Sequence, residues 1–377
     1  MATLYQKTKL LRGLISRESA YTGPFHVSVD VTRRCNLKCL GCRYHSTEVN
    51  RPSLTDHSVM DVSFDMLERL CQELRAMNTR TLFLMGEGEP FLHTRIYDII
   101  AMAKRLGFHV TVITNGTLLD ENSIKSIIDS QLDILQVSLW ASSSREYERQ
   151  YPGADINNFE KVVNGLKLVQ SFKAGRKKNK PAVTLHHPIN RNNFQKLDAM
   201  VDLALLTGCD TISFSPFLST QGKLSSYSLS PDEEKSLFLT LAEIKKQMRY
   251  IHLNHNIDRT LLRYQVGMKK GMKYKLPCYI GWYHTRIKID GTVLPCGPCN
   301  IPMGNLKKNG FREIWNSPSF CAFRRQTMTC EGLASLDQQC DCEFCCYTED
   351  NLQVHRLFRW LAPLCASRRI EKKNGNK

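Results

Sequence analysis

The stretch Thr32-Arg33-Arg34-Cys35-Asn36-Leu37-Lys38-Cys39-Leu40-Gly41-Cys42 places three cysteines in the pattern CxxxCxxC directly after an apolar run. Iron in a [4Fe-4S] cluster is normally held by four thiolates, so three closely spaced thiolates suggest a cluster with one iron open to another ligand. The same thiolates could instead form a structural zinc site, because His45 is close enough in sequence to supply a fourth ligand. The spacing differs from the paired motifs usual for zinc, which favours iron and sulfur.

Around this loop, short apolar runs that favour strands alternate with segments whose apolar residues recur at helical spacing. The predicted strands are 25–31, 81–85, 109–114, 134–139, 182–187 and 211–215. The predicted helices between them are 64–77, 95–106, 121–130, 159–172 and 193–206. Such alternation predicts an α/β fold with a parallel sheet, whose functional residues follow the C-terminal ends of the strands. The local pattern does not distinguish a doubly wound sheet from a barrel.

The cysteine loop after the first strand, together with Gly88-Glu89-Pro90 after the second, resembles the radical S-adenosylmethionine (SAM) superfamily. The resemblance implies a partial (β/α)6 TIM-like barrel. It also implies a SAM-binding [4Fe-4S] cluster, held by the metal ligands Cys35, Cys39 and Cys42.

The resemblance further implies which residues contact SAM. The segment Gly86-Glu87-Gly88-Glu89 resembles the family's GGEP element, which holds the amino group of SAM, although Glu87 replaces the usual glycine. Asn115 after the third strand and Ser138 at the end of the fourth are the other expected contacts. Taken alone, glycines after a strand equally describe an ordinary turn. Strand alternation sends only one of His186 and His187 inward, and neither receives a catalytic role.

A second group of cysteines lies near the C-terminus. Cys278 is followed by twelve residues, Gly291, four residues and Cys296, and later by Cys342 and Cys345. This order resembles a shortened, one-cluster SPASM or twitch domain with an Asp-Gly hairpin, which implies an auxiliary [4Fe-4S] cluster on these four thiolates. Four thiolates that include a CxxC pair also describe a zinc ribbon. Any of the remaining cysteines there could replace a proposed ligand: Cys299, Cys321, Cys330, Cys340 and Cys346.

These observations divide the chain into five predicted parts. They are an N-terminal basic arm at 1–20, a radical SAM partial barrel at 21–235, a helical bridge at 236–276, a small cysteine-rich α+β SPASM/twitch domain at 277–347 and a basic tail at 348–377. The boundary near Pro277 rests on an abrupt change to cysteine, glycine and proline.

Composition limits the partners and the location. The 52 Lys and Arg against 36 Asp and Glu give a net charge of +16, which would attract anionic partners. Because the excess lies in short scattered runs, nucleic acid is not an expected partner. No run approaches the roughly 20 apolar residues of a membrane helix, and no secretory signal is evident, so we expect a cytoplasmic protein without membrane contact.

The expected reaction also follows from the resemblance. An external donor such as flavodoxin or ferredoxin supplies an electron, SAM is cleaved to methionine and a 5′-deoxyadenosyl radical, and the radical abstracts hydrogen from a substrate carbon, as in an oxidoreductase. No separate peptide-recognition domain is evident in the first 24 residues, which favours a small and anionic substrate such as a sugar, aminocyclitol or nucleotide. Two alternatives are a peptide- or protein-modifying enzyme and a non-catalytic metal-cluster protein that binds RNA.

Overall fold

The sheet is built from strands whose side chains alternate between two environments. A computed structural model describes residues 4–48, 58–218, 224–268, 276–336, 339–340 and 345–358. In β2 (Thr81–Met85), β4 (Ile134–Ser138) and β5 (Ala182–Ile189), every second side chain is buried under the surrounding helices, and the others face the interior of the fold. This period-two pattern is the one expected of a sheet with one face packed against helices.

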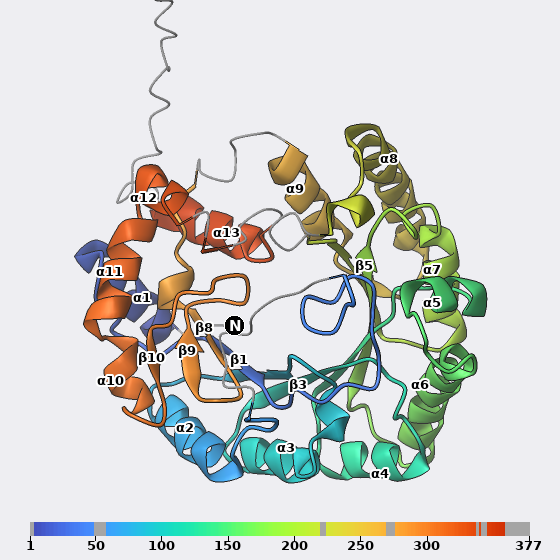
Figure 1. Ribbon diagram of the computed structural model, residues 1–377, viewed down its shortest axis with the longest axis horizontal. Helices are drawn as coiled ribbons and strands as arrows, with labels where there is room; N and C mark the ends of the chain where they lie inside the picture. The colour runs from blue at the N-terminus through green and yellow to red at the C-terminus, as the bar shows by residue number, and fades with distance from the viewer. Residues whose placement is uncertain are drawn as a thin grey trace, which may run out of the picture.

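In the described part of the chain, ten strands form one sheet in the order β10-β9-β8-β1-β2-β3-β4-β5-β6-β7. The run from β8 to β7 is parallel throughout, and β9 and β10 are added antiparallel. The remaining strands are β1 (His26–Asp30), β3 (His109–Thr114), β6 (Thr211–Pro216), β7 (Asn254–His255), β8 (His284–Ile287), β9 (Thr292–Leu294) and β10 (Gly304–Asn305). Because the sheet keeps two edges, it is an open barrel, and the predicted fold class is confirmed (Figure 1).

Helices surround the strands as an outer layer (Figure 1). They are α2 (Phe64–Ala76), α3 (Ile96–Arg105), α4 (Glu121–Asp129), α5 (Ser144–Gln150), α6 (Asn158–Gly175), α7 (Leu197–Leu206), α8 (Pro231–Gln247) and α9 (Ile257–Met268). Capping residues fix the N-termini of two of these helices. Ser63 caps α2, and Ser230 caps α8, which has Pro231 in its first turn. The seven-residue α5 was not predicted from the sequence.

The C-terminal part joins the barrel sheet. The predicted hairpin is confirmed, because β8 and β9 pair antiparallel and Gly291 adopts a φ of +87° in the turn. Beyond the prediction, β8 pairs parallel with β1, so the sheet continues across the position where the sequence changes composition. The helices α10 (Phe311–Trp315), α11 (Pro318–Thr327), α12 (Cys330–Ala334) and α13 (Thr348–Phe358) follow, and a disulfide joins Cys299 to Cys340.

The N-terminal segment forms a helix, α1 (Leu4–Ser16), that packs on the C-terminal part. Leu10 and Leu14 are buried, and the indole N–H of Trp282 donates to the carbonyl oxygen of Ser19 at 3.2 Å. Segments from opposite ends of the chain therefore share one core. Across the described residues, no helix is both long enough and apolar enough to cross a membrane.

Candidate functional site

The loop after β1 brings three thiols together. Cys35, Cys39 and Cys42 are half-buried and outside any disulfide, and the Sγ of Cys42 accepts hydrogen bonds from the backbone N–H groups of Tyr44 (3.4 Å) and His45 (3.3 Å). Burial raises the pKa of Cys35 to about 11 and that of Cys39 well above its usual value, and the neighbouring thiols add to both shifts. Clustered thiolates that repel one another require a cationic partner, so this donor set fits an iron-sulfur cluster.

His45 does not complete a zinc site with these thiols. Its Nε2 donates a hydrogen bond to the carbonyl oxygen of Glu87 at 2.7 Å, and burial lowers the pKa of the imidazole, which is therefore neutral at pH 7. Within the described ranges, no three His, Cys, Asp or Glu side chains converge on a point where a single metal ion could bind. The placement of His45 therefore favours the cluster over the zinc alternative.

Two glycines allow the turn after β2 to lie against the cysteine loop. A Cβ atom at Gly86 would lie 2.8 Å from the carbonyl oxygen of Thr32, and one at Gly88 would lie 2.1 Å from that of Arg34. The backbone N–H of Glu89 donates to the same Arg34 oxygen at 2.7 Å. This contact sets the backbone of the turn beside the three thiols, where its carbonyl groups could accept hydrogen bonds from an ammonium group.

Glu89 and Asn115 connect the turn, β3 and the cysteine loop. The buried carboxylate of Glu89 accepts hydrogen bonds from Thr114 Oγ1 and from the Asn115 backbone N–H, both at 2.7 Å. Burial raises the pKa of Glu89 to about 6, although these hydrogen bonds oppose the shift. The Asn115 amide donates to Asn36 Oδ1 at 2.9 Å. Glu89 and Asn115 thus hold neighbouring strand ends in position, whatever contact they make with SAM.

The remaining predicted positions face the barrel interior. Ser138 is the half-buried last residue of β4. On β5, His186 is the inward histidine and lies 3.0 Å from Ser213 Oγ and 3.1 Å from Ser215 Oγ, whereas His187 is fully buried on the helix side. Burial lowers the pKa of His186 to about 4, so its imidazole is neutral at pH 7 and forms hydrogen bonds with the two hydroxyl groups.

The change Gly88→Ala is expected to weaken SAM binding about tenfold or more, because the added methyl group would overlap the Arg34 carbonyl and push the turn from the loop. Equilibrium dialysis of SAM against the anaerobically reconstituted protein measures the change. Gly175→Ala is the matched control, because nothing lies within 4 Å of a Cβ atom there. Equal SAM affinity in the two variants would contradict the role given to this turn.

A cavity of about 300 Å³ lies between the cysteine loop and the C-terminal part. Trp140 and Phe217 form an aromatic wall, edge to face with ring centroids 6.0 Å apart. A Cβ atom at Gly41 would lie 2.3 Å from the Trp140 ring, so only glycine lets the loop approach this wall. The other lining residues are Arg43, Tyr44, Met85, Gly86, Pro188, Ser215, Pro216, Leu218, Arg286, Gly297, Pro298 and Cys346.

A buried ion pair, which no sequence motif indicated, joins Asp30 of β1 to Arg286 of β8. The Asp30 carboxylate is fully buried and receives three hydrogen bonds of 2.8–3.1 Å from the Arg286 guanidinium, which also donates to Tyr44 Oη at 2.9 Å. Although burial opposes it, Asp30 raises the pKa of Arg286 above its usual value. The available signal was a charged residue inside each of two apolar strands, Asp30 as the last residue of β1 and Arg286 within β8.

Three of the four cysteines predicted to hold the auxiliary cluster, Cys278, Cys296 and Cys345, are described and lie outside disulfides. Cys342 lies outside the described residues. Cys278 and Cys345 are half-buried, and Cys296 is buried. Burial raises the pKa of Cys278 to about 11, as expected for a thiol that has no cationic partner.

Cys346, which the sequence analysis left unassigned, lies with this group. The charges of Cys346, Cys296 and Cys345 all raise the pKa of the Tyr347 phenol, after the larger effect of burial. Cys346 also raises the pKa of Cys278. Three described thiols therefore lie near Tyr347, Cys278 is linked to them through Cys346, and Cys346 lines the cavity described above.

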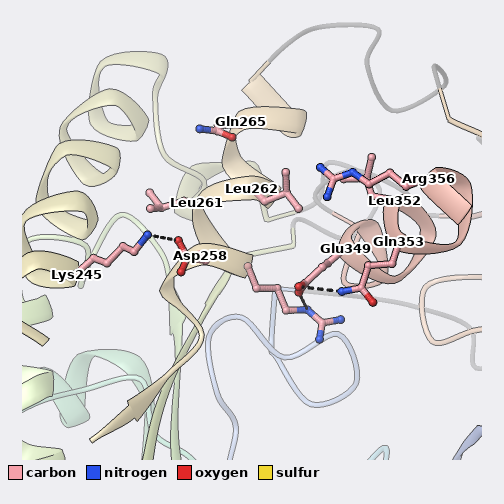
Figure 2. A pocket seen from close by; sticks show the side chains of 10 residues that line it. Lys245, Asp258, Leu261, Leu262, Gln265, Glu349, Leu352, Gln353 and Arg356 are labelled. Atoms are coloured by element: carbon pink, nitrogen blue, oxygen red, sulfur yellow. Dashed lines mark hydrogen bonds and ion pairs between the residues drawn. The ribbon is translucent and has the colours of Figure 1, made fainter. Parts of the chain in front are cut away.

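A second cavity, of about 440 Å³, lies between α9 and α13 (Figure 2). At one end Lys245 and Asp258 form an ion pair of 2.5 Å, and at the other Arg259 contacts Glu349 at 3.5 Å. The Arg259 guanidinium also donates to the carbonyl oxygen of Cys346 at 2.9 Å. None of the lining residues belongs to the cysteine loop or to the turn after β2, so we do not place the reaction there.

Two domains of this chain match known families. Residues 29–204 match the radical SAM superfamily, and residues 278–348 match the iron-sulfur cluster-binding domain SPASM. The chain is therefore a radical SAM enzyme with a C-terminal SPASM domain, as its sequence motifs predict. The two domains imply a [4Fe-4S] cluster, SAM and auxiliary clusters.

Similar proteins include an AdoMet-dependent heme synthase from Methanosarcina barkeri, 23% identical over 308 residues, which span 78% of this chain and 82% of that protein. The PqqA peptide cyclase of Methylobacterium nodulans is 24% identical over 328 residues, or 84% of this chain and 79% of the cyclase.

Solved structures show the same fold. Streptococcus suis SuiB bound to precursor peptide SuiA has a TM-score of 0.63 at 15% identity and covers 85% of this chain and 71% of SuiB. Native anSMEcpe with bound AdoMet has a TM-score of 0.62 at 16% identity and covers 90% of this chain and all (100%) of that chain.

Proposed function

We propose that this radical SAM enzyme modifies a residue of a peptide or protein. The observation that carries the proposal is the cavity of about 300 Å³, which extends from the cysteine loop and Gly86 to Cys346. Its aromatic wall of Trp140 and Phe217 suits an apolar side chain, and its size is at the lower end of the range of roughly 300–1,000 Å³ found for ligand sites. A substrate side chain there would lie between the two groups of cysteines.

The relatives support the peptide class. The PqqA peptide cyclase is named for a peptide substrate, and SuiB is solved with its precursor peptide SuiA. These findings favour the alternative drawn from the sequence over the expected small molecule such as a sugar, aminocyclitol or nucleotide. We expected a small anionic substrate from the positive net charge and from the first 24 residues. The relatives are a stronger guide to the substrate class than these two features.

The proposed reaction needs residues that bind the cluster, SAM and the substrate side chain. We propose that Cys35, Cys39 and Cys42 hold the first cluster and that Gly86, Glu87, Gly88, Glu89, Asn115 and Ser138 form the SAM site. When bound, the cluster and SAM would supply the 5′-deoxyadenosyl radical that takes hydrogen from a substrate carbon. Trp140 and Phe217 would exclude water from that radical, and the Asp30–Arg286 pair would keep Tyr44 fixed at the cavity wall.

An oxidoreductase-type reaction also needs an electron acceptor. After loss of a hydrogen atom, the substrate radical would release one electron and one proton to complete a two-electron oxidation. We propose that the auxiliary site of Cys278, Cys296, Cys342 and Cys345, with Cys346 as an additional candidate ligand, holds the acceptor. An external flavodoxin or ferredoxin would supply the electron for SAM cleavage.

The anaerobically reconstituted and chemically reduced protein is expected to form 5′-deoxyadenosine from SAM, and the variant with alanine at Cys35, Cys39 and Cys42 is expected to form none. Chromatography of the nucleoside measures both. Cys209→Ala is the matched control, because Cys209 is a buried thiol of the βα core that lies outside the cavity lining. Equal product from the triple variant would contradict the proposed cluster site.

The substrate class needs a second measurement. An unfractionated cell extract, which holds both peptides and proteins, is expected to stimulate 5′-deoxyadenosine formation, and prior digestion of the extract with proteases is expected to remove the stimulation. Stimulation that survives digestion would contradict the peptide proposal and restore the small-molecule one.

A further inference from the structure

Five charged side chains are packed together at the turn formed by residues 86–89, here called the SAM turn. They are Asp30, Arg33, Glu87, Arg286 and Lys288. Only Arg33 has appreciable solvent exposure, at 13% of its side chain, and the other four side chains are exposed by 6% or less. Charged groups are rarely buried to this extent unless they are paired. The burial of these five charged side chains therefore needs an explanation in terms of structure or function.

Glu87 lies at the centre of these contacts. One oxygen of its carboxylate pairs with the ammonium of Lys288, and the other accepts a hydrogen bond from Arg33 Nε at 3.1 Å. Lys288 Nζ also lies 3.2 Å from Asp30 Oδ2. The three segments that meet here are the turn after β2, the cysteine loop and the hairpin of the SPASM domain.

The backbone of the same turn is also held by hydrogen bonds. The imidazole of His45 donates to the carbonyl oxygen of Glu87 at 2.7 Å, and the N–H of Glu89 donates to the carbonyl oxygen of Arg34 at 2.7 Å. The Glu87 backbone and its side chain are thus both fixed. A shift of the turn would have to break a buried ion pair as well as these hydrogen bonds.

Position 87 is also where the chain departs from the GGEP element, which has glycine there. Glycine would leave the Lys288 ammonium with the Tyr44 ring, 5.0 Å from its centroid, and with one carboxylate, that of Asp30, which already accepts three hydrogen bonds from Arg286. Glu87 therefore supplies a negative charge that the buried ammonium of Lys288 would lack if position 87 held the usual glycine.

We propose that Glu87 and Lys288 are positioning residues for SAM, and that their ion pair ties the SAM turn to the β8–β9 hairpin of the SPASM domain. The inference rests on the proposed role of turn 86–89, which Gly88→Ala tests separately, and it does not depend on the substrate. Removing Lys288 leaves the Glu87 carboxylate with Arg33 and takes away the ion pair between the turn and the hairpin, so the turn is held less firmly. Removing both partners takes away one positive and one negative charge together.

The test compares Lys288→Met, Lys288→Arg, Glu87→Gly and the double variant Glu87→Gly/Lys288→Met in the reconstituted full chain. Equilibrium dialysis gives the SAM affinity, the electron paramagnetic resonance spectrum of the reduced cluster reports how SAM changes its surroundings, and thermal melting gives stability. Lys173→Met is the matched control, because Lys173 is also buried and its ion pair of 3.1 Å, with Asp210, joins α6 to the residue before β6 and does not involve the turn or the hairpin.

Lys288→Met is expected to weaken SAM affinity about tenfold and to reduce the spectral change caused by SAM. Lys288→Arg should retain most of the affinity, and the double variant should bind SAM better than Lys288→Met does. Lys173→Met should lower the melting temperature without changing SAM affinity. If Lys288→Met does not fold, the SAM affinity and the cluster spectrum of Lys288→Arg and Glu87→Gly test the proposal instead.

Two results would overturn the inference. One is that Lys288→Met and Glu87→Gly lose stability as Lys173→Met does but keep the SAM affinity and spectrum of the unmodified protein, which would make the ion pair purely structural. The other is that the double variant loses as much affinity as the two single variants combined, which would show that the two residues act independently.

Discussion

Replacing Arg324 with methionine is expected to lower the free energy of unfolding by about 4 kcal/mol. The side chain is fully buried in α11, and its guanidinium donates to the carbonyl oxygens of Gly281 (2.8 Å), Trp315 (2.6 Å) and Glu18 (2.9 Å). Methionine would fill much of the volume but leave these oxygens without donors. Each unsatisfied buried group costs about 1–3 kcal/mol.

Arg325 provides a neighbouring control. Its side chain is 60% exposed and pairs with Glu18 at 2.7 Å, so Arg325→Met is expected to change the free energy of unfolding by less than about 1 kcal/mol. Denaturant unfolding of both variants measures the difference. Similar losses in Arg324→Met and Arg325→Met would show that the buried hydrogen bonds of Arg324 contribute little.

The protein is also expected to lose about 5 kcal/mol of stability between pH 7 and pH 5 through four buried groups. Burial lowers the pKa of His186 to about 4 and the pKa values of His187 and His284 to about 3, against an ordinary value of 6.5. The unfolded chain therefore takes up protons first, and stability falls as the pH drops below 6.5. Glu89, whose pKa is raised to about 6, opposes this by about 1 kcal/mol at pH 5, because the folded state binds that proton more tightly.

His187→Phe isolates one of these contributions. The ring is fully buried beside Phe214, so an aromatic replacement keeps the packing and removes the titration. The variant should lose about 2 kcal/mol less than the unmodified protein between pH 7 and pH 5. Denaturant unfolding at the two pH values measures this, and the exposed His252→Gln is the control. An unchanged pH dependence in His187→Phe would contradict the prediction.

The sequence predicted the individual strands and helices well because these elements are encoded locally, whereas the barrel itself was expected only from the family resemblance. Alternating burial along β2, β4 and β5, and the apolar faces of α2, α3 and α4, are period-two and helical patterns that can be read within one segment. The short α5 was missed because seven residues carry less than two turns of pattern, although Ser143 caps it. Pairing of β8 with β1 was missed because it is non-local.

The candidate site was predicted unevenly for the same reason. Motif spacing identified the thiols of the cysteine loop and the glycines of the turn, since both are continuous in sequence. The ion pair of the Glu87 side chain was not predicted, because its partner Lys288 lies in another domain. Grouping Cys346 with Cys278 and Cys296 likewise required the folded chain.

The pairing of β8 with β1 means that the SPASM domain is not a detachable module. A chain cut before Pro277 would expose β1 as a new edge strand, whose residues from His26 to Val29 now pair with β8. Unprotected edges of this kind recruit other chains and promote aggregation. Exchange of this domain between related enzymes would therefore succeed only if the incoming segment brings a strand that matches β1 in register.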